Sequence, residues 1–364
     1  MGLKSLTGGS KIPQNWQFTP EWMTPIIARE HPGARLSKVT HVGGSEGTSS
    51  RARFELEYAA GTGPGAVFAK TQGDWLHRLL HVMTENLYQE GQLYASGVQL
   101  PLEYPKPVYG VVDKLRLNYL AIMEDLSPRG VVLHDATKPL SVDAVASGLR
   151  GLARMHSAFW NLSSETCPEL AWAKPWKASW TFQQTLRRTC GIGIANLKDS
   201  LPAEVAALGA KGMEQWWSRY IRTVSRGPMT FLHGDPHVGN TYLVPGGELG
   251  FLDWACCRKG NWAFDVGYFL VSALDVADCR AHEADLVEEY RRALDVPAAE
   301  LPTTEEAWLR YRTTPAYGLA VWVATGSSVN YQSSEICSNL VHRYGRAFLD
   351  LDTRAAIASL ENTL

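Results

Sequence analysis

The sequence predicts an α+β fold of two lobes, with a small β-rich lobe at the N-terminus and a larger, mainly helical lobe after it. Before residue 125, apolar and polar residues alternate as in strands, whereas after it apolar residues recur every three or four positions as in helices. The polar, turn-rich segment 124–130 separates the two patterns. We therefore expect lobes at residues 1–125 and 126–364.

The N-terminal lobe is predicted to begin with a helix at Pro20, because Thr19 suits the N-cap and Glu21 the first turn. Alternating residues predict strands at 36–42, 52–58 and 66–70. A glycine-rich loop at 43–50 joins the first two strands, and Lys70 ends the third. The remaining elements of this lobe are expected at 74–96, as a helix, and at 108–112 and 117–123, as a hairpin.

Helices dominate the predicted C-terminal lobe. Ser141 is expected to cap a helix whose apolar residues follow a 3–4 spacing as far as Phe159. Further helices are expected near 178–197, 203–224, 263–275, 280–294, 304–324 and 335–350. Short strands within 231–254 form a small β insertion among them. This order of elements is the plan of a bilobal protein-kinase-like fold.

The composition is that of an ordinary globular protein, with 45% hydrophobic and 20% charged residues. The net charge of -2 gives no electrostatic argument for nucleic acid or an anionic membrane as the main partner. No apolar run approaches the roughly 20 residues that a membrane span needs, and the N-terminus lacks the apolar core of a secretory signal. The cysteines show no paired CxxC spacing, so we expect a cytoplasmic protein with reduced thiols.

The segment 231–254, FLHGDPHVGNTYLVPGGELGFLDW, concentrates residues that can carry chemistry. Phosphoryl transfer requires mainly positioning and charge neutralisation, which a lysine, Mg²⁺ ligands and a carboxylate facing the acceptor hydroxyl provide. Asp235 and Asn240 have the spacing of the catalytic aspartate and the magnesium-binding asparagine of protein kinases. Asp253 follows across a Pro-Gly-Gly turn, so a hairpin can bring it to the same point.

The pattern HGDPHVGN followed by FLDW resembles the signature of the aminoglycoside phosphotransferase and choline kinase superfamily. The continuation RKGNWAFDVGYFL at 258–270 looks most like its ecdysteroid-kinase-like branch, and LARMHSAFW at 152–160 and IMEDL at 122–126 also fit. The resemblance spans residues 18 to 350. It implies a protein-kinase-like fold and an enzyme that uses ATP and Mg²⁺ to phosphorylate a hydroxyl of a small molecule.

Carried over residue by residue, the resemblance implies that Asp235 is the catalytic aspartate, which orients or deprotonates the acceptor hydroxyl. Asn240 and Asp253 match the Mg²⁺ ligands. Lys70 matches the lysine of the third strand, and Glu90 best fits the helix partner of that lysine.

The resemblance implies further contacts with ATP. Glu85 competes for the role of the helix partner. The backbone around Met123 and Asp125 would hydrogen-bond the adenine. Gly44 and Ser45 would cover the phosphates, although their loop lacks the GxGxxG pattern of protein kinases.

A metal hydrolase is the competing interpretation of this segment. It would use His233, Asp235 and His237 as ligands, but it needs further ligands and leaves the FLDW segment unexplained. We interpret both histidines as structural groups that brace the loop. His156 is expected to be a buried hydrogen-bonding residue, and Asp265 is expected to tie the loop to a helix start.

The acceptor is expected to bind the helical lobe. The insertion from Trp160 to Tyr220 is rich in tryptophan and carries at least as many basic as acidic residues, whereas an aminoglycoside site needs dense carboxylates. We predict a lipophilic or aromatic-contacting alcohol first, a choline-like amino alcohol second and an aminoglycoside third. The competing interpretation is that these tryptophans only pack in the core. A kinase-fold protein that binds nucleotide without catalysis is the alternative of another class.

Overall fold

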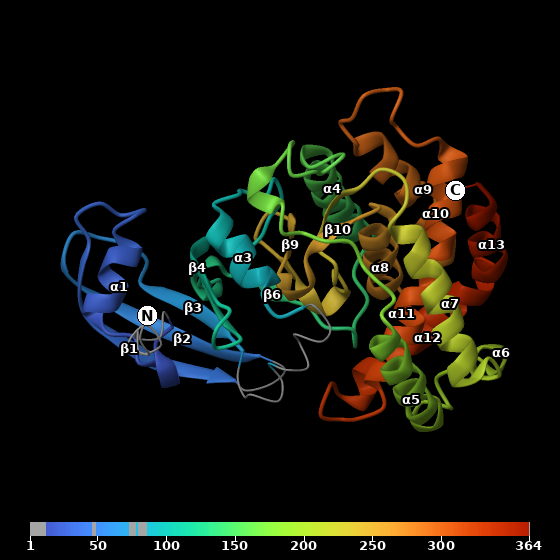
Figure 1. The fold of residues 1–364 in the computed structure, drawn as a ribbon, viewed down its shortest axis with the longest axis horizontal. Coiled ribbons are helices and arrows are strands. Elements are labelled where there is room, and N and C mark those ends of the chain that lie inside the picture. The colour runs from blue at the N-terminus through green and yellow to red at the C-terminus, as the bar shows by residue number, and fades with distance from the viewer. Residues whose placement is uncertain (1–11, 46–48, 73–77, 79–85, 364) are drawn as a thin grey trace, which may run out of the picture. The chain divides into compact units, whose positions relative to one another are not determined.

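The computed structural model describes residues 12–45, 49–72, 78 and 86–363. The chain divides into two compact units (Figure 1). Unit 1 consists of Met1–Val98 and Pro105–Pro128, and unit 2 of Gln99–Tyr104 and Arg129–Leu364. The antiparallel sheet of unit 1 and the many helices of unit 2 confirm the predicted α+β class. Within the described ranges, no helix is both long and apolar enough to cross a membrane.

Unit 1 is built on a five-stranded antiparallel sheet with the order β1-β2-β3-β5-β4. Its strands are β1 (Arg35–Ser45), β2 (Ser50–Ala60), β3 (Ala66–Thr71), β4 (Pro107–Asp113) and β5 (Asn118–Glu124). β1 continues to Ser45, past the predicted start of the loop at Gly43. The reason is a bulge after His41, which lets Gly43 and Gly44 still pair with β2.

The core of unit 1 lies between the sheet and helix α1 (Pro20–Ile27), which the short 3-10 helix η2 (Gln14–Trp16) precedes. α1 begins as predicted, because the Thr19 hydroxyl accepts a hydrogen bond of 3.3 Å from the Trp22 N–H. The ring centroids of Phe18, before α1, and Phe54, on β2, lie 4.6 Å apart. This aromatic contact anchors the helix on the sheet.

Helix α3 (Gln89–Ser96) covers only the end of the helix predicted at 74–96. Residues 86–88, directly before it, are not helical. The apolar spacing continues through them because Leu87 is buried by tertiary packing, which the pattern alone cannot distinguish from a helix. Residues 73–77 and 79–85 lie outside the described residues.

Unit 2 is mainly helical. Its α-helices are α4 (Val142–Ala158), α5 (Trp180–Asn196), α6 (Ala203–Ala206), α7 (Gly209–Val224), α8 (Ala263–Ala273), α9 (Val276–Ala293), α10 (Thr304–Thr313), α11 (Pro315–Thr325), α12 (Ser334–Asp350) and α13 (Thr353–Thr363). Its short strands are β6 (Val132–Leu133), β7 (Thr230–Leu232), β8 (Thr241–Leu243), β9 (Leu249–Phe251) and β10 (Arg258–Gly260). They form the sheets β6-β8-β9 and β10-β7. The predicted β insertion is thus present between α7 and α8.

Three differences from the predicted helices have local causes. The helix predicted at 203–224 is divided into α6 and α7, because Gly209 adopts a φ of +61°. The helix predicted at 304–324 is divided into α10 and α11, because Pro315 has no N–H to continue the hydrogen-bond ladder. α13 is not among the predicted helices. Its buried residues nevertheless recur at helical spacing: Thr353, Ala356, Ile357 and Leu360.

Helix α8 lies at the centre of unit 2, and all of its residues are buried. It packs against α4, α9, α10, α11 and α12 (Figure 1). Thr314 approaches the helix closely at Gly267, where a Cβ would lie 1.9 Å from the Thr314 hydroxyl oxygen. α8 also contacts the short helix η5 (Val238–Asn240), so it positions the loop that carries the candidate site.

Candidate active site

In unit 1, Lys70 on β3 and Glu90 on α3 form a buried ion pair. The Nζ of Lys70 lies 2.9 Å from the Oε2 of Glu90, and the two side chains are 5% and 1% exposed. The Tyr119 hydroxyl donates a hydrogen bond of 3.2 Å to the same carboxylate oxygen. The structure therefore pairs Lys70 with the first of its two predicted partners. The competing residue, Glu85, lies outside the described residues.

Met123 and Asp125, at the end of β5, use their side chains to hold this segment in place. The Asp125 carboxylate accepts hydrogen bonds from the Arg53 Nε at 2.7 Å and from the Ser127 N–H at 3.0 Å. Burial alone would raise the pKa of Asp125, but the hydrogen bonds from Ser127 and Arg53 outweigh it and lower this pKa. The Met123 sulfur accepts from the Tyr94 hydroxyl at 3.7 Å. The backbone of the segment remains the predicted contact for adenine.

Gly44 and Ser45 lie in the sheet of unit 1, at the end of β1. Gly44 pairs with Ala52 and Ser45 with Arg51. A Cβ at Gly44 would lie 2.2 Å from the Arg51 carbonyl oxygen, so this close approach of two backbones requires glycine. Residues 46–48 of the predicted phosphate loop lie outside the described residues.

In unit 2, the loop that carries Asp235 connects β7 to β8, and His233 braces it. The Nε2 of His233 donates a hydrogen bond of 2.9 Å to the Leu252 carbonyl, and its Nδ1 accepts one of 3.2 Å from the Asp235 N–H. Backbone groups therefore use both ring nitrogens, which excludes His233 from the ligand set of a metal hydrolase. In the described part of the chain, no three His, Cys, Asp or Glu side chains are grouped as a metal site would require.

Asp265, in the first turn of α8, ties this loop to the helix as predicted. Its carboxylate accepts hydrogen bonds of 2.7 Å from the His233 N–H and 3.0 Å from the Gly234 N–H. Gly234 has a φ of +80°, and a Cβ there would lie 2.0 Å from the Cys256 carbonyl oxygen, so the turn requires glycine. The Nε2 of His156 lies 3.3 Å from the same carboxylate, and His156 is completely buried, as predicted.

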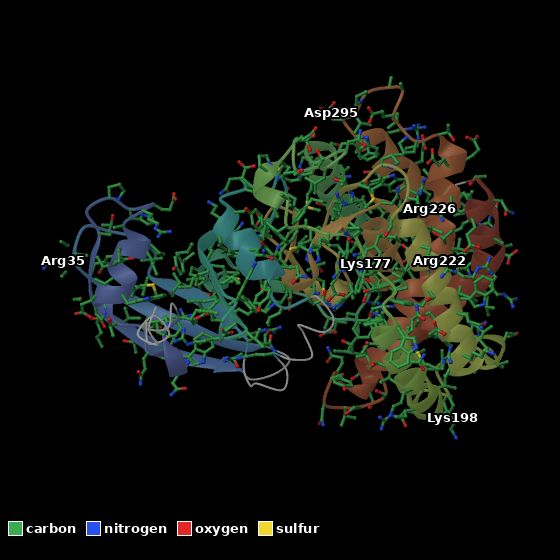
Figure 2. All side chains as sticks on the ribbon, in the orientation of Figure 1. Arg35, Lys177, Lys198, Arg222, Arg226 and Asp295 are labelled. Carbon is green, nitrogen blue, oxygen red and sulfur yellow. The ribbon has the colours of Figure 1, made fainter. Side chains whose placement is uncertain are left out.

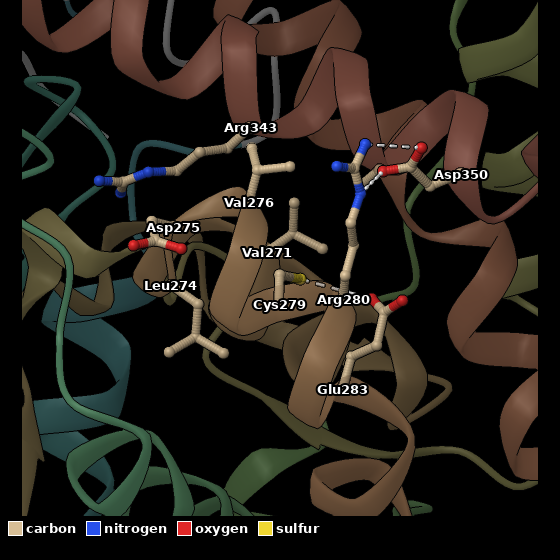
Figure 3. Close-up of a pocket in the computed structure, with 10 residues that line it drawn as sticks. Val271, Leu274, Asp275, Val276, Cys279, Arg280, Glu283, Arg343 and Asp350 are labelled. Carbon is tan, nitrogen blue, oxygen red and sulfur yellow. Dashed lines mark hydrogen bonds and ion pairs between the residues drawn. The ribbon is translucent and has the colours of Figure 1, made fainter.

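Two hydroxyl groups further along α8, which the sequence analysis misses, also support the loop. The Tyr268 hydroxyl faces the Asp235 carboxylate, and its interaction with that carboxylate lowers the pKa of Asp235, against the larger effect of burial. The Ser272 hydroxyl accepts a hydrogen bond of 2.9 Å from the Val238 N–H, and Arg343 on α12 donates to the Ser272 carbonyl. Arg343 borders a cavity of about 10 Å³ between α8, α9 and α12 (Figure 3). This volume holds at most one water, so the cavity is a packing defect and not a ligand site.

Asn240 is oriented by Asp235. Its Nδ2 donates hydrogen bonds of 2.8 Å to the Asp235 carbonyl and 3.2 Å to the Asp235 carboxylate. Because the amide nitrogen faces these acceptors, the side-chain oxygen of Asn240 is directed away from them. An amide oxygen held in this way suits a hard cation such as Mg²⁺.

The β8–β9 hairpin brings Asn240 and Asp253 to the same end of a small sheet. The strands pair in antiparallel register, and the Leu252 N–H donates a hydrogen bond of 2.9 Å to the Asn240 carbonyl. Asp253 has a φ of +64°, which is uncommon for a residue other than glycine and recurs at functional sites. The amide oxygen and the carboxylate provided here fit the donor set of Mg²⁺.

The Asp235 side chain keeps 31% of its surface exposed, but protein atoms surround the carboxylate closely, which makes this a poor place for a negative charge. Burial raises the pKa of Asp235 to about 8, and the charge of Asp253 contributes to this rise, against hydrogen bonds from Tyr268 and Asn240. A divalent cation beside Asp253 would offset the effect of the Asp253 charge on this pKa. Burial also lowers the pKa of His237 to about 4, so its imidazole, 3.9 Å from the Asp235 carboxylate, is neutral at pH 7.

The tryptophans of the predicted acceptor insertion divide into core and surface residues. Trp217 is fully buried and Trp176 is 7% exposed, and the ring of Phe182 lies against both. The guanidinium carbon of Arg258 lies 3.6 Å from the centre of the Trp176 ring. Trp180, at the start of α5, is 74% exposed. The packing interpretation therefore holds for Trp176 and Trp217, whereas Trp180 presents its ring to the surface.

Comparisons with known proteins give a matching family and structures of similar fold. Residues 48–309 match the phosphotransferase enzyme family. The fold resembles the GDP complex of aminoglycoside 2′-phosphotransferase-IIIa, with 13% identity, a TM-score of 0.50 and coverage of 92% of this chain and 99% of that one. It also resembles spectinomycin phosphotransferase with ADP and spectinomycin, with 13% identity, a TM-score of 0.49 and coverage of 95% and 99%. A search of curated proteins finds no match.

The matched region includes most of the chain and every element of the loop and hairpin described above. The chain therefore belongs to the phosphotransferase enzyme family. It is an enzyme that phosphorylates a hydroxyl group of a small molecule. Its place in the ecdysteroid-kinase-like branch stays a prediction.

Proposed function

We propose that this protein is an ATP-dependent kinase that transfers the γ-phosphate to a lipophilic or aromatic-contacting alcohol. The observation that carries the proposal is the braced loop and hairpin of unit 2, which hold Asp235, Asn240 and Asp253 together. A carboxylate for the acceptor and two oxygen ligands for a cation are the groups that phosphoryl transfer requires.

In this proposal, Asp235 orients the acceptor hydroxyl and accepts its proton. Without a cation, the pKa of Asp235 is about 8, so the charges of neighbouring groups determine whether the carboxylate is protonated near pH 7. Asn240 and Asp253 hold Mg²⁺, which neutralises charge on the transferring phosphate when it is bound. The backbone hydrogen bonds of His233 and Asp265 keep these groups in place without involving the reacting atoms.

Unit 1 supplies the nucleotide contacts. Lys70, oriented by Glu90, contacts the α/β-phosphates, and the backbone near Met123 and Asp125 contacts the adenine. Gly44 and Ser45 at the end of β1 lie next to the phosphate loop. GDP is bound in the aminoglycoside 2′-phosphotransferase-IIIa of similar fold, which supports a purine nucleotide as the phosphate donor.

An apolar alcohol is the acceptor class that the insertion favours. The insertion carries the exposed ring of Trp180, and its basic residues disfavour a polycation such as an aminoglycoside. A choline-like amino alcohol ranks second, because a quaternary ammonium group binds well over aromatic rings. Kanamycin-like compounds are therefore expected to be poorer acceptors than hydrophobic alcohols.

The proposal is tested by incubating the protein with MgATP and a set of hydroxylated compounds and measuring the mass gain of one phosphate. With any acceptor found, Asp235→Asn should lower kcat by about 10²–10⁴-fold, while ATP affinity stays as in the parent. If the variant transfers phosphate at the parental rate, the catalytic role of Asp235 is wrong. If the parent binds MgATP but phosphorylates none of the hydrophobic alcohols, the proposed acceptor class is wrong.

A further inference from the structure

A groove lies on unit 2 between the segment before α5 and the end of α7. Pro175–Ala178 form one side, and residues from Ile221 to Arg226 form the other. The Ser225 hydroxyl joins the two sides by donating a hydrogen bond of 3.1 Å to the Trp176 carbonyl. The groove has a volume of about 510 Å³, which is the size of a small-molecule site.

The floor of the groove is apolar and its rim is basic. The half-buried Pro175 and Ala178 and the edge of Trp176, which is 7% exposed, supply the apolar surface of the floor. Lys177, Arg222 and Arg226 are exposed and supply the charged side chains of the rim. None of the described residues that line the groove is acidic. Figure 2 labels these three cations on unit 2. Such a surface matches a ligand with an apolar body and an anionic group.

A second hollow of about 420 Å³ continues the groove along α7, and the two share Gln183 and Arg222. Arg219 lines this second hollow, so Arg219 and Arg222 lie on one face of α7, and Arg226 follows just after the end of the helix. They face one carboxylate, that of Glu361, which accepts a hydrogen bond of 3.1 Å from Arg219 and lies 3.9 Å from Arg222.

The second carboxylate near the groove is already neutralised, because Glu214 accepts a hydrogen bond of 2.8 Å from Arg187. Among the described residues, Glu361 is the only carboxylate that forms an ion pair with Arg219 and Arg222, and neither Lys177 nor Arg226 forms one. A monoanion would leave part of this positive charge uncompensated, whereas a phosphate monoester carries nearly two negative charges at pH 7. Guanidinium groups also match phosphate oxygens in geometry.

We propose that this groove binds a phosphate monoester with an aromatic or aliphatic body, with the phosphate on Lys177, Arg222 and Arg226 and the body on the Trp176 floor. The inference does not depend on the kinase activity, because it concerns binding and no turnover is needed to measure it. It adds a second ligand site to unit 2, apart from the residues assigned to the cation and the acceptor hydroxyl.

Isothermal titration of the full chain with phenyl phosphate tests the proposal. The variant Arg222→Gln/Arg226→Gln should bind about tenfold more weakly or worse than the parent. Lys198→Gln, which removes an exposed cation outside the groove (Figure 2), is the matched control and should bind as the parent does. Inorganic phosphate and phenol should each bind more weakly than phenyl phosphate, because each supplies one half of the ligand.

Equal affinity of Arg222→Gln/Arg226→Gln and the parent would overturn the proposal, as it would place phenyl phosphate at another site. Equal losses in that variant and in Lys198→Gln would also overturn it, since they would indicate a general charge effect. Circular dichroism establishes that each variant is folded. If the double variant does not fold, Lys177→Gln on the opposite side of the groove decides. Its affinity for phenyl phosphate should be about two- to fivefold lower than that of the parent. An unchanged affinity would overturn the proposal.

Discussion

The buried ion pair of Lys70 and Glu90 gives a prediction that can be measured without knowing the acceptor. Glu90→Gln keeps the shape of the side chain and an acceptor for the Tyr119 hydroxyl, but removes the negative charge. Lys70→Met keeps much of the apolar stem and removes the positive charge. A double-mutant cycle with these variants isolates the energy of the pair.

The magnitude follows from the distance and the burial. Two unit charges 2.9 Å apart attract each other by about 6 kcal/mol at an effective dielectric constant of about 20. The side chains are 5% and 1% exposed, so water screens them little. Removing one partner of a buried pair costs about 3–5 kcal/mol, and removing both charges costs far less. The loss in the double variant should be at least about 2 kcal/mol smaller than the sum of the two single losses.

The assay is urea unfolding followed by circular dichroism, with hydrogen exchange of the β3 amides to assign the transition to unit 1. The matched control is Lys38 with Glu57, an ion pair of 3.0 Å on the same sheet whose side chains are 61% and 60% exposed. Its cycle should give less than about 1 kcal/mol. If the loss of unfolding free energy in the double variant equals the sum of the two single losses within about 0.5 kcal/mol, the reasoning is refuted.

Three further predictions concern unit 2. Asp253→Asn removes a negative charge from the cation site, so it should lower the affinity for Mg²⁺ and strongly reduce turnover with MgATP; unchanged turnover would contradict the metal assignment. Folded Asp235, whose pKa burial raises to about 8, keeps its proton in a range where the unfolded chain, with a pKa of about 3.9, has lost it. The metal-free protein should therefore lose stability as pH rises from about 4 to 8. Between pH 5 and pH 8, the melting temperature of Asp235→Asn should fall less than that of the parent. An equal fall in both proteins would contradict the raised pKa. Gly193→Ala would place a Cβ 1.8 Å from the Val323 carbonyl oxygen and should lower the free energy of unfolding by about 1–3 kcal/mol, whereas Gly191→Ala, with a contact of 3.7 Å, should cost nothing in the same thermal melts.

The strands of unit 1 could be predicted because each face of a strand has one environment. In β2, Ala52, Phe54 and Leu56 are buried, whereas Glu55 and Glu57 between and after them are exposed, so the period of two is visible in the sequence. The helix ends at Gly209 and Pro315 were harder to predict. Apolar residues continue on both sides of each break, so the pattern of burial does not reveal the change in backbone direction.

The site residues of unit 2 could be predicted because they lie close together in the sequence. Asp235, Asn240 and Asp253 belong to one loop and one hairpin, so their spacing alone indicates that they meet. The Lys70–Glu90 contact required the resemblance to a family, since a strand and a helix contribute one residue each. Their roles in binding and catalysis stay predictions until the variants are measured.

Helix α8 contains a pattern that could have predicted how this helix supports the loop, which the sequence analysis missed. Its residues are all apolar or glycine except Asp265, Tyr268 and Ser272, at positions i, i+3 and i+7 on one face. A helix that is buried on all sides must satisfy such groups internally. An irregular loop offers suitable partners, because its N–H groups are not used by a helix or a sheet. Polar residues at this spacing in an apolar helix therefore predict a contact with irregular backbone, and in this protein the backbone contacts of Asp265 and Ser272 hold the loop of Asp235.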